Sequence, residues 1–101
     1  METNELQKEA NNIINIIDKK LDVNHNAEAT FIHLIEELGE LARQHNNKSI
    51  RKIEQDQINI EEEIADISIM IMRVATINEV NIEKAIINKI QKLKERHNLG
   101  A

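Results

Sequence analysis

The sequence contains no cysteine, no proline, no tryptophan and no tyrosine, and Phe31 is its only aromatic residue. Without cysteine, neither a disulfide nor a thiolate metal site can form. Without proline and with only two glycines, few positions interrupt a helix. No stretch resembles a signal peptide or a membrane-spanning segment, so we expect a cytoplasmic protein with no membrane partner.

Length and charge limit the function classes further. A chain of 101 residues predicts one domain, residues 1–101, whose small core would gain from association with a second copy. The net charge of −5 argues against a nucleic-acid partner. The charge is uneven, because residues 28–66 carry ten acids and four bases whereas residues 81–101 carry five bases and two acids. These two regions either attract each other or together bind a metal and a phosphate.

Hydrophobic residues recur at helical spacing in most of the chain. This periodicity predicts four helices, at about residues 3–21, 27–44, 59–77 and 82–97. We expect Asn26 and Asn81 to be N-caps, and the polar residues 45–58 to form a loop. The short segment before Asn26 reads as a turn, and we assign no function to its histidine, His25.

The third predicted helix has an unusual composition. Its segment ISIMIM, residues 67–72, is apolar on nearly every face, whereas a helix in a small bundle normally keeps one polar side. The simplest explanation is that its outer face packs against another copy of the chain. We therefore predict an all-α protein, a bundle of four helices that associates into a dimer or a larger oligomer.

Two pairs of acidic residues border the apolar stripes of the second and third helices. Glu37 and Glu40 form one pair, and Glu63 and Asp66 form the other. Residues three apart are neighbours on a helix and can share a ligand. Facing carboxylates repel by roughly 3 kcal/mol per close pair at an effective dielectric constant of about 20. Oxygen ligands suit Mg²⁺ or Mn²⁺, so the pairs either hold such a cation or form two solvated helix faces.

Three more charged or titratable residues belong to this pattern. His33 lies within about 60° of Glu37 and Glu40 around the helix axis, and we interpret it as a histidine at the core boundary. Lys89 and Arg96 lie seven residues apart on one stripe of the fourth helix. They are either phosphate ligands or ordinary basic residues near a helix C-terminus.

The two acidic motifs resemble those of a known family. EELGEL, residues 36–41, and EEEIADI, residues 61–67, are similar to the EExxE and ExxD motifs of the MazG-like nucleotide pyrophosphohydrolases. The similarity covers about residues 31–97 and includes the basic segment VNIEKAIINKIQKLKERH. It implies an all-α fold in a dimer or tetramer, and Mg²⁺-dependent hydrolysis of a nucleoside triphosphate between the α- and β-phosphates.

The resemblance also implies roles for individual residues. It implies that the metal would be bound by four acids, Glu37, Glu40, Glu63 and Asp66. Lys89 and Arg96 would contact phosphate, and Glu36 is either the base that activates water or a solvated surface residue. The chain lacks the tryptophan or tyrosine on which pyrimidine-selective members stack the base, and Leu93 stands where some relatives have asparagine. Base selectivity is therefore left open.

Other functions fit the sequence less well. A phosphoribosyl-ATP pyrophosphatase shares the acidic pattern, but the lysine-rich segment that precedes the first acidic motif in those enzymes is missing here. A di-iron carboxylate bundle needs a histidine three residues after a glutamate, and no glutamate in this chain has one. A non-catalytic helical oligomerisation module would explain the apolar third helix but not the two acidic pairs.

Overall fold

The computed structural model describes residues 2–49 and 57–100, and these form four α-helices and no β-strand. The helices are α1 (Thr3–Leu21), α2 (Ala27–Ser49), α3 (Gln57–Ile77) and α4 (Ile82–Arg96). The prediction of an all-α fold is therefore confirmed. Within the described ranges no helix is both long enough and apolar enough to cross a membrane.

Both predicted N-caps are confirmed. The side chain of Asn26 accepts a hydrogen bond from the backbone N–H of Ala29 at 2.9 Å, and Asn81 accepts one from the N–H of Lys84 at 3.1 Å. Each bond satisfies an N–H that has no partner inside its own helix. These caps fix the first residues of α2 and α4.

The predicted boundaries between α2 and α3 are wrong where the structure describes them. Helix α2 continues to Ser49, five residues past the predicted end at Gln44, and α3 starts at Gln57, two residues before the predicted start. Residues 50–56 of the predicted loop lie outside the described residues. His45 and Asn46 are polar and exposed. The last part of α2 therefore lacks hydrophobic periodicity, although it is helical. No proline or glycine interrupts it.

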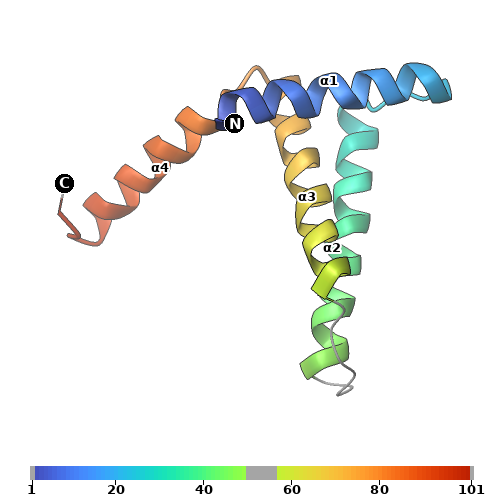
Figure 1. Ribbon diagram of the computed structural model, residues 1–101. Coiled ribbons are helices and arrows are strands. Elements are labelled where there is room, and N and C mark those ends of the chain that lie inside the picture. Colours follow the sequence, from blue (N-terminus) through green and yellow to red (C-terminus); the bar gives the residue numbers. More distant parts are fainter. Residues whose placement is uncertain (1, 50–56, 101) are drawn as a thin grey trace.

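The four helices do not close into a bundle within one chain, contrary to our prediction. Helices α2 and α3 lie side by side as an arm, α1 lies across one end of this arm, and α4 extends away from it (Figure 1). The radius of gyration is 16.5 Å, compared with about 13 Å for a compact domain of this size. The chain is therefore open, because α4 packs on α1 and leaves the sides of the arm uncovered.

The buried core is small and lies where α1 meets the arm. Among the described residues, its apolar side chains come from α1 and α3, namely Ala10, Ile14, Ile67, Met70 and Ala75. Other large apolar side chains stay about half exposed, including Phe31 on α2 and both Ile86 and Ile90 on α4. One chain thus leaves much of its apolar surface in contact with water.

A buried glutamine attaches the α3–α4 connection to α1. The Gln7 side-chain amide donates to the carbonyl of Val80 at 2.8 Å and to the Thr76 hydroxyl at 3.2 Å. Its carbonyl oxygen accepts from the N–H of Ile82 at 2.9 Å, at the first residue of α4. This one side chain therefore positions α4 relative to α1.

Replacing Gln7 with alanine should lower the free energy of unfolding by about 1–3 kcal/mol, because it leaves part-buried backbone groups without partners. Gln91→Ala is the matched control, since Gln91 is exposed and its amide donates to Glu95, one turn away on α4, and we expect an effect within about 0.5 kcal/mol. Urea denaturation of both variants measures the difference. Equal effects would show that the Gln7 contacts do not stabilise this junction.

Candidate metal centre

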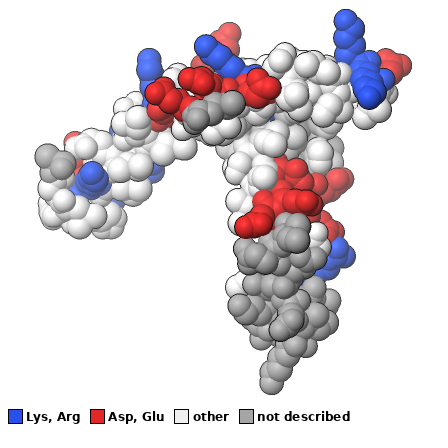
Figure 2. Space-filling model, viewed as in Figure 1, with Lys and Arg blue, Asp and Glu red and all other residues white. Residues whose placement is uncertain are grey.

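Three of the four acids predicted to bind metal meet on the α2–α3 arm. One carboxylate oxygen each from Glu37, Glu63 and Asp66 lie within 4.8 Å of one another. Glu37 and Glu63 are half-buried and Asp66 is exposed. Acidic side chains gather about halfway along the arm (Figure 2). The helical spacing within α3 and the packing of α2 on α3 together create this group.

Glu63 is the most perturbed acid of the group. A hydrogen bond with Glu37, burial, and the charges of Glu37, Asp66 and Glu40 raise the pKa of Glu63 to about 7. Its Oε2 is buried, and no N–H or O–H of the described residues donates to it. Two carboxylate anions cannot form a hydrogen bond with each other. The hydrogen bond between Glu63 and Glu37 therefore needs a proton on one of the two groups. The group as a whole lacks positive charge.

A divalent cation fits this group of side chains. The available donors are carboxylate oxygens, which hard cations such as Mg²⁺ and Mn²⁺ prefer. The buried Oε2 of Glu63 has no hydrogen-bond partner among the described residues, and such an ion would be one. The residues present therefore match the chemistry of a divalent-metal site.

Glu40 and Glu36 lie outside the group of three acids. The carboxylate of Glu40 pairs instead with Arg43, one turn further along α2, although its charge still contributes to the raised pKa of Glu63. Glu36 is exposed on α2. The structure therefore brings together one acid of the first predicted pair and both acids of the second.

The two basic residues predicted to bind phosphate lie elsewhere in the chain. Lys89 and Arg96 are exposed on α4, which packs on α1. Figure 1 shows α4 extending away from the arm that carries the acids. One chain alone does not bring these cations to the acidic group.

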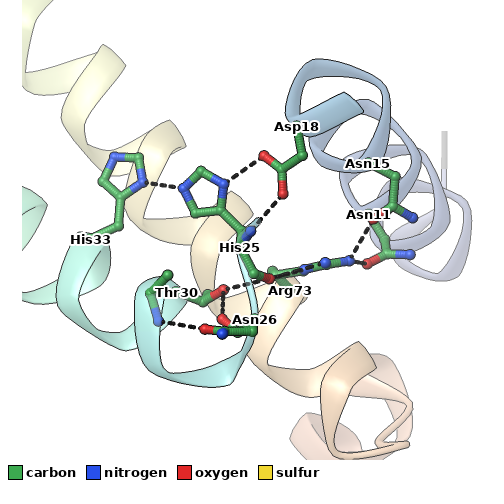
Figure 3. A network of polar contacts seen from close by, with 9 residues as sticks. Asn11, Asn15, Asp18, His25, Asn26, Thr30, His33 and Arg73 are labelled. Carbon is green, nitrogen blue, oxygen red and sulfur yellow. Dashed lines mark hydrogen bonds and ion pairs between the residues drawn. The ribbon is translucent and has the colours of Figure 1, made fainter. Parts of the chain in front are cut away.

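We did not predict a polar network that ends at this group, and Figure 3 shows its residues from α1 to His33. His25 Nδ1 lies 2.6 Å from Asp18 Oδ1, and His25 Nε2 lies 3.3 Å from His33 Nδ1. His33 Nε2 in turn lies 3.3 Å from Glu37 Oε1. Arg73 donates to the backbone carbonyl of His25 at 3.2 and 3.0 Å. The network thus connects α1, the turn before α2, α2 and α3.

One feature of the sequence could have indicated this network. Asp18 follows Ile14 by four residues, which places a charged side chain on the buried face of α1 together with Gln7 and Ala10. A buried carboxylate needs a partner, and here His25 is that partner. Our interpretation of His25 as a turn residue without function therefore overlooked its role in the structure.

The environment of Asp18 keeps it ionised. Burial by itself raises the pKa of Asp18, but hydrogen bonds from the ring and the backbone N–H of His25 outweigh it, and Arg73 adds positive charge nearby. The net result is a pKa below the usual value of 3.8. Stability from this group is therefore present above that value and is lost as the pH falls through the lowered pKa.

The Glu63 pKa predicts the opposite pH dependence in a higher range. Folded Glu63 keeps its proton up to a pH of about 7, whereas the unfolded chain loses it near 4.5, so the folded state binds more protons between these values. The contribution of Glu63 to the stability of the metal-free protein should be complete below 4.5 and should disappear as the pH rises through 7.

Thermal unfolding in a chelator at about pH 5 and about pH 8 tests this expectation. Glu63→Gln cannot titrate, so its melting temperature should exceed that of the wild type at the higher pH and approach it at the lower pH. Glu9→Gln, an exposed substitution on α1, is the control. An unchanged difference between Glu63→Gln and the wild type across this range would contradict the expectation.

Comparison with protein families identifies the family of this chain. Neither the curated proteins nor the solved structures gave a match. The sequence matches the MazG nucleotide pyrophosphohydrolase domain over residues 25–100, well over half of the chain, and the matched range includes all three acids of the group. The chain therefore belongs to the MazG nucleotide pyrophosphohydrolase family.

Proposed function

We propose that the protein is a Mg²⁺-dependent nucleoside triphosphate pyrophosphohydrolase that cleaves between the α- and β-phosphates and releases a nucleoside monophosphate and pyrophosphate. The observation that carries this proposal is the group of Glu37, Glu63 and Asp66, with its buried and unpaired carboxylate oxygen, in a chain of the MazG family. Mn²⁺ is the alternative cation, since it prefers the same oxygen ligands.

In this proposal Glu37, Glu63 and Asp66 hold the cation, and Glu40 joins them by leaving Arg43. Glu40 pairs with Arg43 at an exposed position, where such an ion pair contributes little stability and is easily broken. When bound, Mg²⁺ supplies positive charge to the phosphate oxygens and makes a coordinated water more acidic. Glu36, next to Glu37 in the chain, then orients or deprotonates the attacking water.

We further propose that Lys89 and Arg96 reach the substrate from a second copy of the chain, in a homodimer or homotetramer. Both lie on α4, away from the acids of their own chain (Figure 1). Exposed isoleucines on α4, such as Ile86 and Ile90, offer apolar surface to a partner arm with apolar surface of its own. Association would then cover this surface and place cations opposite acids.

Replacing Glu40 with glutamine should lower the rate of pyrophosphate release by at least about 100-fold, because even indirect partners of a catalytic metal contribute 10–100-fold. Circular dichroism should show unchanged helix content. Glu28→Gln is the control, since Glu28 is an exposed acid in the first turn of the same helix. Full activity of Glu40→Gln over the nucleoside triphosphates would remove Glu40 from the site.

Coexpression of two inactive variants tests the role of α4 from a partner. One variant carries Lys89→Ala and Arg96→Ala, and the other carries Glu40→Gln. In a mixed dimer, one of the two sites combines intact acids with an intact α4, so random pairing should restore about a quarter of the wild-type activity. The two variants assayed separately are the controls. Coexpressed protein no more active than either variant alone would show that the cations do not act across subunits.

A further inference from the structure

A chain of polar contacts runs from α1 to the acidic group, and Figure 3 shows the part from Asp18 to His33. It starts at Asp18, passes through the rings of His25 and His33, and ends at Glu37, with successive distances of 2.6, 3.3 and 3.3 Å. The two imidazole rings are stacked, with centroids 5.4 Å apart and an interplanar angle of 29°. The chain thus connects a carboxylate on α1 to an acid of the candidate metal centre.

The α1 end of this chain is held at several points. Asp18 is buried and also accepts a hydrogen bond from the backbone N–H of His25 at 2.6 Å. The carbonyl of His25 accepts two hydrogen bonds from Arg73, whose guanidinium also contacts Asn11 and Asn15. Both the ring and the backbone of His25 are therefore fixed against α1 and α3.

The chemistry of the two end groups sets the direction of the hydrogen bonds. Asp18 is ionised and can only accept, so His25 donates from Nδ1. A Glu37 carboxylate that binds a cation has no hydrogen to donate, so His33 then donates to it from Nε2. The contact between the two rings becomes a hydrogen bond when one further hydrogen lies between His25 Nε2 and His33 Nδ1. In either case the last N–H of the chain is directed at Glu37 Oε1.

We infer that His33 is a positioning residue, which fixes the carboxylate of Glu37 for metal binding and is itself fixed by His25 and Asp18. This inference rests on the proposed function, in which Glu37 holds the cation. The Glu37 side chain is mostly buried, so the contact with His33 is partly shielded from competing water. A carboxylate has two oxygens, and binding one of them to His33 restricts its rotation while the other remains available to a cation.

The role extends the site beyond the residues that match the family. Asp18 lies on α1, before the matched range of residues 25–100, yet it is the buried anchor of the chain. Partners that orient a metal ligand typically change metal affinity by 10–100-fold when they are removed. We therefore expect His33 to affect Mg²⁺ affinity although it is not itself a ligand.

Titration calorimetry with Mg²⁺ alone, without nucleotide, tests the inference. His33→Leu removes both ring nitrogens and should weaken Mg²⁺ binding by about 10–100-fold. His33→Gln keeps an N–H donor at about the reach of Nε2 and should recover part of this loss, whereas His33→Asn should not. His97→Leu, at the exposed C-cap of α4, is the matched control and should bind like the wild type.

Nuclear magnetic resonance of the ring nitrogens gives a second readout that a merely structural role would not produce. In the Mg²⁺-bound protein, His33 should carry a hydrogen on Nε2 and His25 should carry one on Nδ1. Addition of Mg²⁺ should shift the ring nitrogens of His33 and, through it, those of His25. In His33→Leu the shift at His25 should disappear.

The outcomes separate this inference from the function on which it rests. If the wild type does not bind Mg²⁺, the proposed function fails and the inference fails with it. If the wild type binds Mg²⁺ but His33→Leu binds it equally well, the metal site stands and the positioning role is wrong. In the Mg²⁺-bound protein, a His33 ring with no hydrogen on Nε2 would likewise overturn the positioning role.

Discussion

The crowding of carboxylates on the α2–α3 arm is the constraint on which the candidate site depends. Glu37, Glu63 and Asp66 place oxygens within 4.8 Å of one another, at distances where like charges repel strongly. Without a cation the group reduces this repulsion by keeping a proton, as the raised pKa of Glu63 indicates. A bound divalent ion would also reduce the repulsion between the carboxylates, and a rise in pH would not remove its charge as it removes the proton.

The polar network at the junction of α1 with the arm stabilises another negative charge, with side chains of the chain itself in place of a cation. Asp18 is a buried carboxylate, and it is stabilised by His25 and by the nearby charge of Arg73. Because Arg73 comes from α3 and Asp18 from α1, their shared partner His25 joins two helices that are distant in sequence. The same histidine leads through His33 to Glu37, so the stability of the junction and the geometry of the acidic group are connected.

The open shape of the chain separates its opposite charges. The arm carries the acids and α4 carries an excess of bases, and α4 leaves the junction in a different direction (Figure 1). Much apolar surface stays exposed on both, while in the part of the chain that the structure describes the fully buried apolar side chains are few and come from α1 and α3. A bundle closed within one chain would have covered this surface, so the exposed faces are available to another molecule.

The sequence by itself determined the helical class, the caps at Asn26 and Asn81, and the spacing that puts Glu63 beside Asp66, because all of these depend on residues within one or two turns of each other. It also carried the motifs of the family. It did not determine which helices pack together, and so it missed the displaced α4. The pairing of Glu40 with Arg43 is a local contact, one turn apart on α2, that we overlooked.

Only the tertiary structure decided the role of the histidines. His25 and Arg73 lie 48 positions apart in the sequence, and nothing in local periodicity brings them or Asp18 together. Their contacts arise because α1 crosses the end of the arm and buries a carboxylate that must be paired. Local propensity thus fixed the helices and the acidic motifs, whereas long-range packing decided which charged groups meet.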